Sequence, residues 1–249
     1  EVQHMLRRTD SNLDFVGDPV NGVLICEVVL QSIARLLPYL ALFVAGELLG
    51  GEGDAGTLRT ILVRPRTRLA IWTAKFITVG LYTLSLSVVM YVASLGLGTL
   101  CFGRGQLCEW SALQNHQLLI LSEREAAAYL ALSYLMLAVA VSVTAALAFS
   151  LGSFFDNGLA PGAIALAIVI ALQITGALPF DWVDTIRPYL FTSFLGDYAK
   201  AMPSSFDPAT MALVLPRDEL RHSLLGCAAY VASFGMIGLW RFLRRDVTC

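Results

Sequence analysis

The chain has 249 residues, of which 57% are hydrophobic and only 14% charged, and its formal net charge at pH 7 is −2. Soluble domains carry about 25% charged residues, so this balance indicates an integral membrane protein. A net charge this close to zero, with no basic patch interleaved with aromatic residues, argues against nucleic acid as a partner.

Five apolar stretches are each long enough to cross a lipid bilayer, which takes about 20 residues of helix. Residues 1–22 come first; they are polar and end in turn signals, so we expect an outer loop there. We expect residues 23–246 to form one all-α membrane domain. The expected spans are about 23–49, 69–99, 129–151, 159–178 and 223–239.

Lysine and arginine are enriched in short cytoplasmic loops, so their positions orient the spans. Four arginines lie between the first two spans, at positions 59, 64, 66 and 68, and three follow the last span, at 241, 244 and 245. Placing both groups inside puts the connectors 102–127 and 179–221 outside. The start of the chain is then also outside, so we expect one earlier span, six spans in all, and a cytoplasmic C-terminus in a bacterial inner membrane.

The stretch from Gly51 to Pro65 is a short polar and basic insertion between two apolar runs. Leu58, Ile61 and Leu62 fall at i, i+3 and i+4, which predicts a short helix with one apolar stripe. Pro65 prevents the helix from continuing. Such a helix between membrane spans needs either the lipid headgroup boundary or a soluble partner to cover its stripe.

The order of residues around this stretch resembles a known family. Gly51-Glu52, Gly56-Thr57-Leu58-Arg59, Pro65, Arg68 and Lys75 follow one span and lead into the next. This order is similar to that of ABC-2 type transporter permeases, in which G-E-x-x-x-G-T-L precedes a basic-apolar helix, P-x-x-R and a Lys entering the next span. The turn at 149–155 and the tail Phe-Leu-Arg-Arg-Asp at 242–246 agree with the resemblance. The segment 53–55 departs from it, because the family often has charged residues there.

The resemblance implies the permease subunit of an ATP-driven exporter, with six helices in a type V exporter-like bundle. Two such subunits, copies or paralogues, would assemble with two cytoplasmic ATPase subunits that bind ATP and Mg²⁺. A short cytoplasmic coupling helix would dock into a groove of the ATPase. The alternative is a helix lying on lipid with its arginines facing anionic headgroups. The coupling residues carried over from the family are Glu52, Gly56, Thr57, Leu58, Arg59, Ile61, Leu62, Arg64, Pro65 and Arg68.

The chain itself lacks recognisable catalytic motifs. The sequence has no HExxH pair, no Walker A glycine loop and no GxSxG elbow, and its three histidines are far apart. We therefore expect no enzyme activity, no metal site and no cofactor in this chain. Two alternatives are an ion-coupled secondary transporter, which should show repeat symmetry or interrupted spans, and an intramembrane enzyme or assembly factor, which should show clustered carboxylates or histidines.

Polar side chains inside the expected spans are further candidates. Glu27, Gln31 and Arg35 recur every fourth residue and so share one face of the first span. Because a charge near the bilayer centre is costly, this face either lines a route between two subunits or lies within the bundle, with Arg35 snorkelling or paired. We expect Lys75 to be an anchor at the inner boundary, and a contact with the ATPase is the alternative.

The outer connectors carry the last candidates. Aromatic and apolar residues recur at helical spacing within 179–221, which predicts short helices on or dipping into the outer leaflet. These helices form either an outer gate or partner site, or plain interfacial helices. Cys101 and Cys108 lie near the outer side and could form a disulfide in an oxidising compartment. The gate candidates are Trp182, Ile186, Tyr189 and Phe194.

Overall fold

Five long helices dominate the structure. The computed structural model describes residues 20–54, 67–110, 118–155, 157–202, 205–207 and 212–244. Within this part, five helices are long and apolar enough to cross a membrane, so the chain is an integral membrane protein and this prediction is confirmed. They are α2 (Gly22–Asp54), α4 (Arg68–Phe102), α5 (Glu123–Gly152), α6 (Ala160–Ala177) and α8 (Arg217–Arg244).

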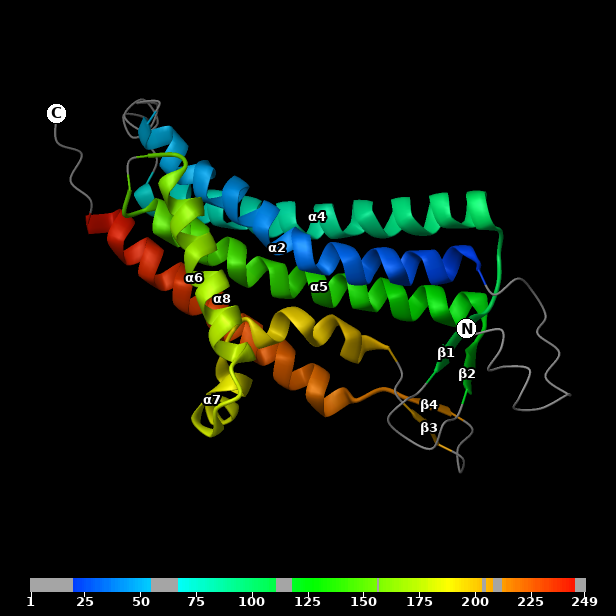
Figure 1. Ribbon diagram of the computed structural model, residues 1–249. Coiled ribbons are helices and arrows are strands. Elements are labelled where there is room, and N and C mark those ends of the chain that lie inside the picture. Colours follow the sequence, from blue (N-terminus) through cyan, green and yellow to red (C-terminus); the bar gives the residue numbers. More distant parts are fainter. Residues whose placement is uncertain are drawn as a thin grey trace, which may run out of the picture.

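Helix α5 is the centre of the bundle. The most apolar part of α5 is 72% buried, whereas the corresponding part of α4 is 17% buried. α2 and α4 run beside α5 on one side, and α8 packs against it from another (Figure 1). The alanine-rich sequence of α5 allows this, since small residues let neighbouring helices approach closely where no water is present.

Helix α6 crosses the other spans at a steep angle (Figure 1). Its first turn lies against the C-terminal part of α2, where the two backbones meet at Gly46 and Gly162. A Cβ atom at Gly46 would lie 2.8 Å from the backbone nitrogen of Gly162, and one at Gly50 would lie 2.7 Å from the carbonyl oxygen of Asn157. Gly46-x-x-x-Gly50 is thus a small-residue motif that brings two helices into backbone contact.

All five spans are helical, as predicted, and the connectors 102–127 and 179–221 add two short hairpins that the sequence did not predict. β1 (Leu107–Trp110) pairs with β2 (Leu118–Leu121), and β3 (Ser205–Asp207) pairs with β4 (Ala212–Val214), both in antiparallel hairpins. Leu107 and Leu121 face each other in the first hairpin and are 1% and 0% exposed. These strands are too short for an alternating pattern to identify them from sequence, and burial of the leucine pair holds the first hairpin against the helices.

The hairpin β1–β2 and the start of α2 are joined at one end of the bundle. Asn21 accepts hydrogen bonds from the backbone N–H groups of Val23 and Leu24, and so caps α2. Its amide nitrogen donates to the carbonyl oxygen of Gln106 over 2.7 Å, just before β1. One buried side chain therefore both begins a span and fixes the connector that follows α4.

Short helices occupy the connector between α6 and α8, as the sequence predicts. They are α7 (Asp181–Ile186) and the 3₁₀ helices η1 (Arg187–Tyr189) and η2 (Ser193–Ala201). η2 packs between α5 and α8. The connector therefore contributes to the bundle itself.

Candidate functional site

The predicted coupling helix lies outside the described residues. Positions 56–65, from Gly56 to Pro65, are among those for which the structure is not described, so their role stays a prediction. The two ends of this segment are described. Glu52 lies in the last turn of α2, and Arg68 is the first residue of α4.

Lys75 fastens these two ends to each other. Its ammonium group donates a hydrogen bond of 2.8 Å to the carbonyl oxygen of Leu48, and it also forms an ion pair with the carboxylate of Glu52. The side chain of Lys75 is 16% exposed. We expected Lys75 to be a boundary anchor, and the structure gives it protein partners on α2. A cation also complements the negative end of the α2 dipole.

An aromatic cluster holds the same part of α4 against the central helix. The rings of Trp72 and Phe76 stack with centroids 4.8 Å apart, and Trp72 meets Phe149 of α5 edge-on at 5.4 Å. Trp72 is 3% exposed. The N-terminal part of α4 is thus joined to α2 by charge and to α5 by ring packing.

The polar residues of α2 form a stripe, as their spacing predicts. The Gln31 amide donates to the Glu27 carboxylate over 3.1 Å. Gln31 and Arg35 are exposed on the helix surface. The stripe extends one step further than expected, because the hydroxyl of Tyr39 donates to the side-chain oxygen of Gln173 on α6 over 2.7 Å. The sequence signal for Tyr39 was the same four-residue spacing.

A second polar cluster, which sequence reasoning missed, joins three spans in the half of the bundle nearer the β1–β2 hairpin. The Ser94 hydroxyl on α4 lies 3.2 Å from the Cys26 sulfur on α2 and 3.0 Å from the Tyr134 hydroxyl on α5. All three side chains are buried. Single Ser, Cys and Tyr residues in apolar runs carry no periodic signal, so only the packing identifies the cluster.

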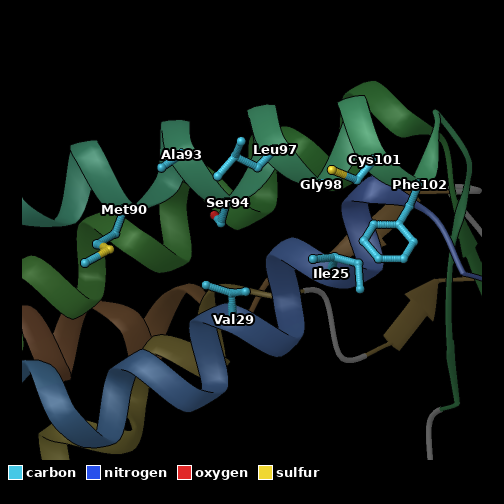
Figure 2. Close-up of a pocket in the computed structure, with 9 residues that line it drawn as sticks. All are labelled: Ile25, Val29, Met90, Ala93, Ser94, Leu97, Gly98, Cys101 and Phe102. Atoms are coloured by element: carbon cyan, nitrogen blue, oxygen red, sulfur yellow. The ribbon is translucent and has the colours of Figure 1, made fainter.

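Beside this cluster an apolar groove of about 280 Å³ opens between α2 and α4. Figure 2 shows Ile25 and Val29 of α2 on one side and Met90, Leu97 and Phe102 of α4 on the other. Cys101 also lines the groove and is a free thiol, so the disulfide with Cys108 is not formed. In the described ranges no three His, Cys, Asp or Glu side chains gather to hold a metal ion.

The gate candidates whose side chains are described differ in how deeply they are buried. Phe194 on η2 is 5% exposed and packs near Tyr230 of α8, with ring centroids 6.2 Å apart. Ile186 and Tyr189 are 46% and 70% exposed. Trp182 lies in α7, and its side chain is outside the described part of the structure. Phe194 joins the connector to α8 through its ring, and Tyr189 does so through its carbonyl oxygen, which accepts a hydrogen bond from the hydroxyl of Tyr230.

Polar contacts fix η2 to the first turns of α8. Asp197 accepts a hydrogen bond from the Ser223 hydroxyl and forms an ion pair of 2.9 Å with Lys200. Lys200 also lies 3.8 Å from Glu219. The side chain of Asp197 is 14% exposed and that of Glu219 is 63% exposed. Because water weakens exposed ion pairs, the ion pair of Lys200 with Asp197 is the stronger of the two.

Comparison with known sequences places the chain in a family. The sequence matches the family described as "Protein of unknown function (DUF2705)" over residues 13–248. The chain belongs to the DUF2705 family. It is also 27% identical over 214 residues to "Uncharacterized protein YhcI" of Bacillus subtilis (strain 168), in a match that covers 83% of this chain and 63% of that protein. The chain thus spans less than two thirds of the length of this relative.

Two features of this DUF2705 chain bring charged and polar side chains together on α2. The Lys75 junction ties two spans together at one end of a segment rich in arginine. The stripe on α2 offers polar groups at membrane depth, where polar side chains need a polar environment. Both features belong to α2.

Proposed function

We propose that this DUF2705 chain is the transmembrane permease subunit of an ABC exporter of the ABC-2 type. It couples ATP hydrolysis by two separate cytoplasmic ATPase subunits to export of a substrate by alternating access. It works as a pair, with a second copy or a paralogue, in the bacterial inner membrane with its C-terminus in the cytoplasm.

The observation that carries the proposal is the ordered motif from Gly51 to Lys75, together with the ion pair that joins its two ends. Lys75, the last residue of the motif, binds Glu52, near its beginning. A force applied to the segment between them therefore reaches α2 and α4 as a unit. A coupling element needs this property, because the ATPase has to move whole spans.

The distribution of charge supports the same assignment. The end of α2 and the start of α4 lie at the same end of the bundle as the end of α8 (Figure 1). Arg68 begins α4, and Arg241 and Arg244 lie in the last turn of α8. Clustering of arginine at one end favours that end as the cytoplasmic one, where an ATPase partner would be found.

Co-purification tests the proposal. The tagged chain is purified in mild detergent from its native membranes, and co-purifying chains are identified by mass spectrometry. We expect an ATPase with a Walker A glycine loop in near-equal amount. The double variant Leu58→Asp plus Ile61→Asp should lose it, because two carboxylates in the apolar stripe cannot be buried against the ATPase without a large desolvation cost.

The matched control is Thr60→Asp plus Val63→Asp. It adds the same charge to the same segment, on the face that a helix would turn away from the stripe. This control should retain the ATPase. Equal recovery of the ATPase with both double variants would show that the stripe is not the docking surface, and absence of any ATPase from the wild-type sample would contradict the proposed function.

A further inference from the structure

Arg35 is a charged side chain near the middle of a membrane span. It lies about 20 Å along the helix axis from the start of α2 and about 28 Å from its end, at 1.5 Å per residue. Its side chain is exposed on the surface of the bundle. Within the described part of the chain, Arg35 has neither an ion-pair partner nor a hydrogen-bond acceptor.

Snorkelling does not solve the problem of this charge. Side chains of a helix lean toward its N-terminus, so the guanidinium of Arg35 can move by roughly one turn toward the Gln31 side. A hydrocarbon core about 30 Å thick still surrounds a group that starts near the helix midpoint. An intramembrane arginine of this kind therefore faces water or a polar partner.

The neighbours of Arg35 along the stripe are hydrogen-bonded to other residues. Gln31 donates to Glu27, which lies about two turns from Arg35, and Tyr39 donates to Gln173 of α6. Arg35 therefore presents a fork of N–H donors that bonds no acceptor among the described residues, between two hydrogen-bonded polar pairs. A planar fork of this kind matches carboxylate and phosphate oxygens.

Exposed apolar side chains lie next to the polar stripe of α2. Leu36 and Leu40 are 62% and 57% exposed on the adjoining surface of α2. A ligand seated at Arg35 therefore meets a cation and hydrocarbon side by side, which suits a molecule with an anionic group and an apolar part.

We propose that Arg35 binds the carboxylate or phosphate group of an amphiphilic solute at mid-membrane depth on the Glu27–Tyr39 stripe of α2. The inference rests on the proposed transport function in one respect, because it takes this face of α2 to border a solute route. It adds the chemical class of the solute and the residue that selects it.

Thiol labelling tests the inference without the ATPase. Ser32 is exposed beside Arg35, and Ser85 is exposed at the middle of α4 among lipid-facing apolar residues. Each is changed to Cys in a background with Cys101, Cys108 and Cys249 replaced by Ser; Cys26 and Cys227 are buried and stay. The purified chain in lipid nanodiscs is then labelled with methanethiosulfonate reagents that carry either a sulfonate or a trimethylammonium group.

We expect Ser32→Cys to react readily and Ser85→Cys to stay nearly unreactive, because only the first borders water. The sulfonate reagent should react faster than the cationic one at Ser32→Cys. Arg35→Gln should lower the sulfonate rate by about threefold to tenfold, through loss of one nearby positive charge, and Arg35→Lys should keep the preference. Arg104→Gln, which removes an exposed charge beyond α4, should change neither rate.

Competitors then identify the source of the anionic group. Phosphatidylglycerol in the nanodisc, compared with phosphatidylcholine alone, probes a lipid headgroup, and added octanoate probes a free anionic amphiphile. We expect either phosphatidylglycerol or octanoate to slow sulfonate labelling of Ser32→Cys, and only when Arg35 is present. The competitor that does so shows whether the anionic group belongs to a lipid headgroup or to a free amphiphile. Equal unreactivity of Ser32→Cys and Ser85→Cys, no effect of Arg35→Gln, or no competition by either anion would overturn the inference. Each of these outcomes leaves the co-purification result for the ATPase unaffected.

Discussion

Gly98 and Gly96 lie two positions apart on α4 and meet different surroundings. A Cβ atom at Gly98 would lie 2.7 Å from the carbonyl oxygen of Gly22, whereas one at Gly96 would meet nothing within 4 Å. Backbone atoms cannot move aside as a side-chain end can. The close contact between the start of α2 and the end of α4 therefore depends on the missing side chain at position 98.

We expect Gly98→Ala to destabilise the protein by about 1–3 kcal/mol, because overpacking forces the two helices apart. Gly96→Ala is the matched control, since both changes bring the same gain of helix propensity, about 1 kcal/mol. Thermal unfolding in detergent micelles measures both, and Gly96→Ala should melt at or above the wild-type temperature. Equal melting temperatures for the two variants would contradict the close crossing.

Residue-level predictions from sequence succeed where one helix contains both partners. The four-residue spacing of Glu27 and Gln31 predicts their shared face, and they are hydrogen-bonded. The contact between Lys75 and Glu52 joins two helices, and no spacing rule reaches across the segment between them. The same holds for Ser94 and Tyr134, which are 40 positions apart.

At the scale of elements, η2 packs against α5 and is held to α8 by one aromatic side chain and one carboxylate. Phe194 lies over Gly226 of α8, where a Cβ atom would be 2.5 Å from the end of the ring. Asp197 bonds Ser223 one turn earlier on the same helix. The connector between α6 and α8 therefore has a defined position, which a gate requires in its closed state.

Phe194→Ala should release η2. Removing a buried phenylalanine costs about 3–5 kcal/mol in general, and here the loss falls on a short 3₁₀ helix, whose hydrogen-bond geometry is poorer than that of an α-helix. Hydrogen exchange followed by mass spectrometry should show faster exchange of residues 193–201, with α5 little changed. Tyr189→Ala removes an aromatic ring that is 70% exposed from the same connector, so it is the control and should leave exchange in η2 unchanged. Slow exchange of η2 in Phe194→Ala would show that Asp197 alone suffices.

Sequence-based boundaries of elements fail where polar residues begin a helix. α5 starts at Glu123, well before the apolar run, because a capping box stabilises its first turn. The Ser122 hydroxyl accepts a hydrogen bond from the backbone N–H of Glu125, and the Glu125 carboxylate accepts from Ser122. α8 likewise starts at Arg217, with Asp218 and Glu219 in its first turn. Hydropathy locates the apolar middle of a span. The polar first turn outside it is identified only from capping residues and from acidic side chains near the helix start.

At the scale of the whole molecule, the two ends of the bundle differ in chemistry. One end carries Arg68, Lys75, Arg241 and Arg244 around the ends of three spans. The opposite end carries the β1–β2 hairpin and the capped start of α2. The apolar stretches of the sequence predict five spans, and the positions of Lys and Arg predict this charge asymmetry. Neither pattern predicts the central place of α5 or the steep crossing of α6, which arise from contacts between small residues on different helices.

The final prediction concerns the orientation that this asymmetry implies. Alkaline phosphatase, which is active only outside the cytoplasm, is inserted between β1 and β2, after Asn157, or after Cys249. We expect activity only for the first insertion, because the arginine-rich end is retained in the cytoplasm. Green fluorescent protein fused at Cys249 should fluoresce.

The Asn157 position is the sharpest test, since the turn between α5 and α6 has no Lys or Arg and its side of the membrane follows only from the alternation of spans. Activity after Asn157 but not after Cys249 would break that alternation, and activity at Cys249 would place the motif from Gly51 to Lys75 outside, beyond reach of a cytoplasmic ATPase.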